Sequence, residues 1–258
     1  MHVAWPSRLL VAAALACAAI VPARAQHPPA RLTVFAASDL GPPFKDLVPE
    51  FEGTGRARVT LVLGSTGMLA QQIRNGAPAD VFFAASEGFV AELAAEGLTI
   101  RDTHTMYAQG RLAAVTLTSG GIRVTSLDDL TDARIRRIAI ANPKHAPYGL
   151  AARQALEAAG LWTSLEPRIV FGENVQQAIQ FVRSGSAQAG LVARSVAGTP
   201  DLLWTLIDSR LHAPLNQMAA VLGRTKHPGD ARAFIEFVTG DRGRTAMRRF
   251  GFVPANER

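Results

Sequence analysis

The chain has 258 residues, 48% of them hydrophobic, and a formal charge of +6. This length allows one large domain or two small ones with a real core. A lone cysteine, Cys17, excludes an intramolecular disulfide. The basic residues are scattered except for a run at 242–249, which we interpret as a solvated helix face, so nucleic acid is not an expected partner.

Residues 1–25 have the pattern of a secretory signal peptide. Arg8 gives a positive start, 9–21 is apolar, and Ala-Arg-Ala at 23–25 is a cleavage site. The alternative is an N-terminal membrane anchor, but the apolar stretch is short for a spanning helix. Cys17 lies in a poor lipoprotein acylation site, because Ala14 stands where a large aliphatic residue is needed. Cleavage would remove the only cysteine, lower the formal charge to +4 and leave a periplasmic protein.

Beyond the leader, apolar β-like runs alternate with amphipathic helical patterns, which predicts parallel sheets covered by helices on both faces. The strand candidates are 32–36, 59–63, 81–85, 112–117, 137–141, 169–171, 189–192 and 218–222. The helix candidates are 44–51, 68–74, 88–96, 150–159, 175–184 and 231–239. Gly160 and Gly185 stand where helix C-terminal glycines belong. There is no Gly/Ser-rich linker, so we predict two lobes that share crossover strands.

Four small polar clusters each follow an apolar run and open a helical pattern. They lie at 37–40, 64–67, 147–149 and 173–176. The N-terminus of a helix offers free backbone N–H groups, which suit an anion. An anion that must be released again is better held by neutral hydrogen bonds than by buried cations, which need their own compensation. The pattern therefore favours an oxyanion pocket with uncharged donors.

Six segments, in the same order, resemble periplasmic molybdate-binding proteins. They are LTVFAAS at 32–38, GSTGMLAQQI at 64–73, NGAPADVF at 75–82, NPKHAPYG at 142–149, GENV at 172–175 and RFGF at 249–252. The resemblance covers 31–253, and GAPADVF is its most specific part. It implies an α/β protein with the type II periplasmic-binding-protein fold, in which two α/β lobes enclose a ligand cleft. We expect lobe 1 to comprise 31–108 plus 217–258, and lobe 2 to comprise 109–216.

The resemblance also implies a function. Such a protein captures molybdate or tungstate and delivers it to the permease and ATPase of an ABC importer at the inner membrane. We expect a monomer that needs no cofactor besides this ligand. The residues expected at the oxyanion are Ser38, Asp39, Ser65, Thr66, Tyr148 and Val175.

Four of these residues are expected to bind the oxygens of molybdate directly. Ser38 and Thr66 would donate through their hydroxyls, Tyr148 through its phenol and Val175 through its main-chain N–H. The alternatives are that Ser38 and Thr66 only cap helices and that Tyr148 only packs on the cleft wall.

Two positions, Asp39 and Ala193, depart from the family pattern, and Arg194 follows the second of them. Asp39 stands where many relatives carry a neutral serine or asparagine, and a carboxylate beside a dianion is unfavourable. Either Asp39 caps the following segment with its side chain turned away, which we expect, or the ligand is not a bare dianion. Ala193 stands where part of the family has a tyrosine, which Tyr148 is expected to replace. Arg194 either gates the cleft or is solvated, and we expect solvation.

Other functions have weaker support. GSTG at 64–67 is not the Gly-x-Ser-x-Gly nucleophile elbow, so no catalytic residue is predicted, although a secreted hydrolase remains an alternative. The six histidines lack metal-site spacing, and His145 is expected to cap or pack within its loop. Iron carriers usually need tyrosine pairs, whereas this chain has only Tyr107 and Tyr148. A carrier for sulfate or another anion on the same fold stays open.

Overall fold

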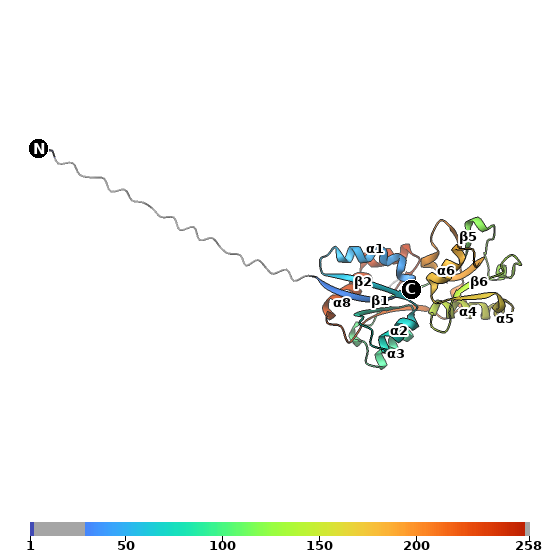
Figure 1. Cartoon of the computed structure of the whole chain (residues 1–258), viewed down its shortest axis with the longest axis horizontal. Coiled ribbons are helices and arrows are strands. Elements are labelled where there is room, and N and C mark those ends of the chain that lie inside the picture. Colours follow the sequence, from blue (N-terminus) through green and yellow to red (C-terminus); the bar gives the residue numbers. More distant parts are fainter. Residues whose placement is uncertain (3–28, 256–258) are drawn as a thin grey trace.

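The structure is a computed structural model that describes residues 1–2 and 29–255. Two α/β lobes lie side by side along the long axis of the molecule (Figure 1). The predicted cleavage site and Cys17 lie outside the described residues. Within the described part of the chain, no helix is long and apolar enough to cross a membrane.

The first lobe is built on a six-stranded mixed sheet. Its strand order is β11-β4-β10-β3-β1-β2. The strands are β1 (Ala30–Ala37), β2 (Ala57–Gly64), β3 (Val81–Ala84), β4 (Thr105–Gly110), β10 (Leu215–Val221) and β11 (Val253–Pro254). Strand β1 pairs parallel with β2 and β3, whereas β10 runs antiparallel to β3 and β4. The helices are α1 (Gly41–Glu52), α2 (Thr66–Arg74), α3 (Glu87–Ala95), α8 (Pro228–Thr239) and α9 (Asp241–Arg249).

The second lobe has a five-stranded mixed sheet in the order β7-β6-β8-β5-β9. Its strands are β5 (Leu112–Leu117), β6 (Ile138–Ala141), β7 (Ile169–Gly172), β8 (Ala189–Ala193) and β9 (Leu202–Leu206). Its helices are α4 (Pro147–Ala158), α5 (Trp162–Leu165), α6 (Val175–Arg183) and α7 (Arg194–Ala197). Short 3-10 turns across both lobes occupy Ser38–Leu40, Arg101–Thr103, Thr118–Gly120, Asp128–Thr131, Glu166–Arg168 and Ser209–Leu211.

Each predicted strand and helix is present, with shifted ends, but the prediction of parallel sheets is wrong for part of each sheet. Strands β5 and β10 enter their sheets from the other lobe without a crossover helix, and each pairs antiparallel with its neighbours. Strands β4, β9 and β11 were not predicted. Gly160 and Gly185 follow α4 and α6 with φ of +70° and +73°, which confirms them as C-terminal glycines.

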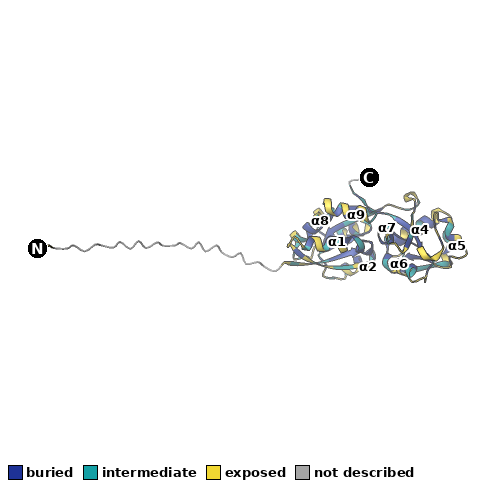
Figure 2. Ribbon diagram, turned by 90° about the horizontal axis from the view of Figure 1, so that it is seen from above, coloured by how far each residue is buried: buried dark blue, intermediate teal, exposed yellow. Residues whose placement is uncertain are grey.

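An aromatic cluster fixes α1 and α8 on one face of the first sheet. Phe44 and Phe234 each pack edge-to-face on Phe83 of β3, with ring centroids 5.2 and 5.7 Å apart. Leu69 and Leu93 of α2 and α3 are buried on the opposite face with Phe82. Figure 2 shows the buried residues concentrated inside each lobe, so that each lobe has its own core. The carboxyl ends of β1 and β3 are therefore held by packing on both faces of the sheet.

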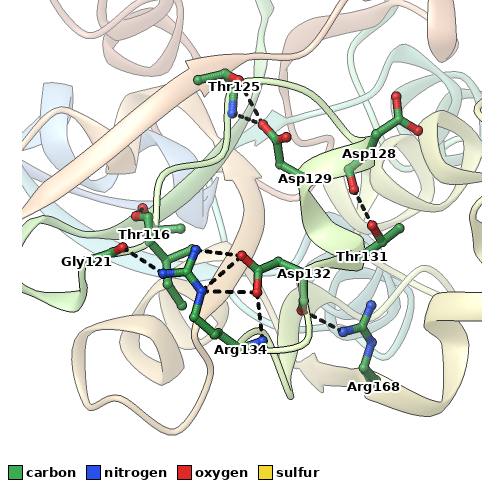
Figure 3. A network of polar contacts seen from close by, with 10 residues as sticks. Thr116, Gly121, Thr125, Asp128, Asp129, Thr131, Asp132, Arg134 and Arg168 are labelled. Carbon is green, nitrogen blue, oxygen red and sulfur yellow. Dashed lines mark hydrogen bonds and ion pairs between the residues drawn. The ribbon is translucent and has the colours of Figure 1, made fainter.

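The long connection between β5 and β6 is fastened by polar contacts (Figure 3). The carboxylate of Asp129 accepts the N–H of Thr125 at 2.7 Å, and Arg134 pairs with Asp132. The guanidinium of Arg168 donates to the main-chain carbonyl of Ile135 at 2.6 Å. These contacts hold the connection within the second lobe.

The chain crosses between the lobes twice. It leaves the first sheet after β4 at Gly110 and enters the second at Leu112, and it returns between β9 and β10. The predicted lobe limits at 108/109 and 216/217 fall within β4 and β10. The assignment of 31–108 plus 217–258 to one lobe and 109–216 to the other stays a prediction.

Candidate functional site

The four clusters predicted from the sequence meet at one small cavity between the two lobes. We call it the cleft cavity. It is lined by Ala37, Ser38, Asp39, Gly64, Ser65, Thr66, Ala85, Ala146, Pro147, Tyr148, Asn174 and Val175. All six predicted site residues are in this set, and none of the described residues that line it is a Lys, Arg or His. Another groove, at Phe89 and Leu150, is mostly apolar, and its polar lining includes the cationic side chain of Lys144.

Thr66 is the first residue of α2 and is buried. Its Oγ1 accepts the main-chain N–H of Ala85 at 3.0 Å. Because the oxygen already accepts this proton, the hydroxyl hydrogen remains for an acceptor in the cleft cavity. The alternative that Thr66 only caps the helix is wrong, since the N-cap position belongs to Ser65.

Ser65 and Gly67 contact His145 across the lobes. The Oγ of Ser65 lies 2.7 Å from Nδ1 of His145, and the N–H of Gly67 donates to the His145 carbonyl at 2.9 Å. A Cβ at Gly67 would lie 2.8 Å from that carbonyl oxygen, so only glycine permits this approach without a shift. The expectation that His145 caps or packs within its own loop is wrong, because it joins the second lobe to α2 of the first. No signal in one sequence reveals such a contact.

The N-terminus of α6 supplies a main-chain donor. Asn174 is its N-cap, and the side-chain oxygen of Asn174 accepts from the N–H groups of Gln176 and Gln177 at 2.9 and 3.1 Å. The first N–H of the helix, on Val175, has no acceptor within the helix, and its contact with a ligand stays a prediction.

Ser38 belongs to the first cluster, at 37–40, and is 4% exposed. The N-cap of its short 3-10 turn is Ala37, so the alternative that Ser38 is a plain cap is wrong. The main-chain carbonyl of Ser38 accepts a hydrogen bond from Nε2 of Gln176 at 3.2 Å, so the first cluster is bonded to α6 of the other lobe.

A buried glutamine that the sequence analysis missed organises the remaining two site residues. Nε2 of Gln217, on β10, donates to Oδ2 of Asp39 at 2.6 Å and to the phenol oxygen of Tyr148 at 2.9 Å. Its Oε1 accepts the phenol of Tyr107 at 2.5 Å. The Tyr148 oxygen accepts from Gln217, so its own proton can be donated, and the Asp39 carboxylate is one acceptor for it. In the sequence Gln217 stands just before the strand predicted at 218–222 and beside a second amide, Asn216, so nothing local marks it as a site residue.

Asp39 does not cap a helix, contrary to expectation, because its side chain is bonded to Gln217. Burial raises the pKa of Asp39 to about 6, although hydrogen bonds from Gln217 and Tyr148 work against this rise. Its Oδ1 is buried and has no hydrogen-bond partner among the described residues.

Burial also raises the pKa of Tyr148 and of Tyr107 well above the usual value, and the charge of Asp39 raises both further. Both phenols therefore keep their protons at neutral pH. They can act as hydrogen-bond donors.

Arg194 is half-buried, so the expectation of solvation holds only in part, and the gating role has no support because its side chain lies over Trp204. Its guanidinium carbon lies 3.8 Å from the ring centroid of Trp204, and burial lowers its pKa. It is not among the residues that line the cleft cavity. The next residue, Ser195, donates through Oγ to the main-chain carbonyl of Asp39 at 2.8 Å, which is another bond between the lobes.

The site offers neutral donors from both lobes around a small space, an arrangement that suits a small oxyanion. Among the described residues, no group of three or more His, Cys, Asp or Glu side chains is placed to hold a metal ion.

Comparison with known proteins gives one consistent result. The chain is 33% identical to the molybdate-binding protein ModA of Azotobacter vinelandii, over 95% of this chain and 97% of that protein. It is 31% identical to ModA of Rhodobacter capsulatus, over 84% and 86%. The solved structure of the Azotobacter vinelandii periplasmic molybdate-binding protein superposes with a TM-score of 0.81 and 30% identity, covering 86% of this chain and 98% of that one. The model of the bacterial extracellular solute-binding protein family matches residues 32–253, and the chain belongs to this family.

Proposed function

We propose that the protein captures molybdate or tungstate outside the cytoplasm and delivers it to an ABC importer. The observation that carries the proposal is the convergence of four helix-opening junctions, two from each lobe, on one cavity lined without cations. The names of the similar proteins, which are molybdate-binding, support the choice of anion.

The donors proposed for the oxygens of the anion are the hydroxyls of Ser38 and Thr66, the phenol of Tyr148 and the main-chain N–H of Val175. Each is buried, and the neighbours of Thr66 and Val175 leave a proton free, whereas the proton of Tyr148 can go to Asp39 or to the anion. Ser65 and Asp39 complete the wall, with the hydroxyl of Ser65 directed to His145. Hydrogen bonds to a charged acceptor are about twice as strong as neutral ones, so these donors suffice without a cation.

A role in binding rather than in catalysis is supported by the neutral donors gathered around a small space and by the similar proteins, which are named as binding proteins. We propose a periplasmic binding protein, monomeric and without enzymatic activity, whose partners are the permease and ATPase of the importer.

Calorimetric titration of the mature protein with molybdate, tungstate, sulfate and phosphate tests the function. We expect tight one-to-one binding of molybdate or tungstate and far weaker binding of sulfate. Equal affinity for sulfate would move the assignment to a general oxyanion carrier, and turnover of ester or phosphoester substrates would indicate an enzyme. No heat with any tetrahedral oxyanion would end the proposal.

A further inference from the structure

Asp39 is a charged side chain in the wall of a cavity proposed to hold an anion. It is 1% exposed, and its Oδ2 is bonded to Gln217. Its Oδ1 is buried without a partner among the described residues. An oxygen in this condition loses hydration without compensation, so its missing partner is expected to come from what enters the cavity.

The groups facing Asp39 leave its charge unneutralised. Gln217 approaches from β10, Tyr107 from β4 and Tyr148 from α4, and the hydroxyl of Ser195 on α7 bonds only the main-chain carbonyl. The two phenols are titratable but keep their protons, and none of these four groups is a cation. An ionised Asp39 would therefore face a bound dianion with no positive charge between them, and like charges in a dry site repel.

We propose that Asp39 couples anion binding to protonation, so that the complex holds one proton shared between the Asp39 carboxyl and an oxygen of the anion. This inference rests on the proposed function and specifies its ligand as an oxyanion bound together with one proton. The proton comes from the solvent. It forms one O–H···O hydrogen bond between the Asp39 carboxyl and the anion, in addition to the bonds from the other donors. It removes the repulsion and supplies the partner that Oδ1 lacks.

The coupling fixes the pH dependence of affinity. Burial places the pKa of Asp39 at about 6 before the anion enters. The anion disfavours the carboxylate and raises this pKa further, so the complex binds more protons than the free protein above pH 6. The dissociation constant should therefore increase about tenfold per pH unit above about pH 6 and level off below it.

The test is calorimetric titration with sodium molybdate at pH 7.5 in two buffers of different ionisation enthalpy. The dissociation constant is also measured from pH 6 to 9. The wild-type protein should take up about one proton per anion. Asp39→Asn, which mimics the neutral carboxyl, should take up none, bind with little dependence on pH and bind more tightly than the wild type at pH 8.

The outcomes separate this inference from the function. Wild-type binding without proton uptake and with a flat pH profile would overturn the coupling and leave molybdate binding in place. Wild-type uptake that persists in Asp39→Asn would assign the proton to another group and overturn the inference as well. Absence of binding to any tetrahedral oxyanion would end both proposals. If Asp39→Asn does not fold, a flat wild-type pH profile without proton uptake still overturns the inference, and Asp39→Ser takes the place of Asp39→Asn in assigning the proton.

Discussion

The donors proposed for the anion are themselves held by hydrogen bonds to neighbouring residues. Thr66 accepts from the Ala85 amide, Tyr148 accepts from Gln217, and Asn174 occupies the second and third N–H groups of α6. For Thr66 and α6, these bonds leave one proton available to the cavity, whereas the proton of Tyr148 also has Asp39 as an acceptor. Such preorganisation lowers the entropy lost when an anion binds.

Among single residues, Thr66 provides the sharpest test of the proposed donors. Thr66→Val keeps the shape but removes both the donor to the anion and the acceptor of the Ala85 N–H, at about 1–3 kcal/mol. We expect molybdate affinity to fall roughly 5- to 150-fold by calorimetry. Thr66→Ser retains the hydroxyl and should bind nearly as the wild type does. Equal affinity of the valine variant and the wild type would remove Thr66 from the site.

At the scale of elements, the N-terminus of α2 forms part of the interface between the lobes. The Gly67 N–H and the Ser65 hydroxyl contact His145, which lies just before α4 of the other lobe. The carbonyls of Ser38 and Asp39 accept from Gln176 of α6 and Ser195 of α7. Helix ends therefore supply both the donors of the cavity and the bonds that close it.

Gly67 allows closure to be tested separately from the donors. In Gly67→Ala, the new Cβ would lie 2.8 Å from the His145 carbonyl, but only when the lobes are together. Overpacking of this kind costs about 1–3 kcal/mol, so affinity should fall roughly 5- to 150-fold while the melting temperature without ligand changes little.

Gly88→Ala is the matched control for this variant. Gly88 is likewise the second residue of its helix in the first lobe, and its nearest atom, Oγ of Ser86, would lie 3.7 Å from the new Cβ. We expect no change in its affinity. If Gly67→Ala binds as well as Gly88→Ala, the His145 contact has no part in binding.

At the scale of the molecule, two crossings connect lobes that each have their own core. Such connections permit rotation of one lobe against the other, because few strands need to bend. The cleft cavity lies at the interface between the lobes, so an anion that bonds to both lobes favours the arrangement in which they meet.

Small-angle scattering should therefore give a smaller radius of gyration with saturating molybdate than without it. Binding to the folded state alone should also raise the melting temperature, by an amount that grows with ligand concentration. An unchanged radius alongside demonstrated binding would show that the lobes stay together without ligand.

Local sequence was sufficient for the strands and helices that carry their own signal. The apolar runs of β1 and β3, the caps before α6 and the glycines after α4 and α6 are properties of neighbouring residues, and the structure contains them. Strands β4 and β9 carry weaker local signals and depend on partners far along the chain. Thr-Met-Tyr-Ala-Gln-Gly of β4 pairs with β10 about 100 residues later, so no local pattern marks it.

By itself the sequence determined the four helix-opening clusters and the choice of uncharged donors in them, because capping and hydroxyl chemistry are local. The tertiary structure decided what those clusters do together: the meeting of four junctions at one cavity, the bond between Ser65 and His145, and the place of Gln217 between Asp39 and Tyr148. The residues of these contacts lie 69 to 178 positions apart in the chain. Only the packing of two separate sheets brings them within hydrogen-bond distance, and burial in that packing, rather than residue type, raises the pKa of Asp39.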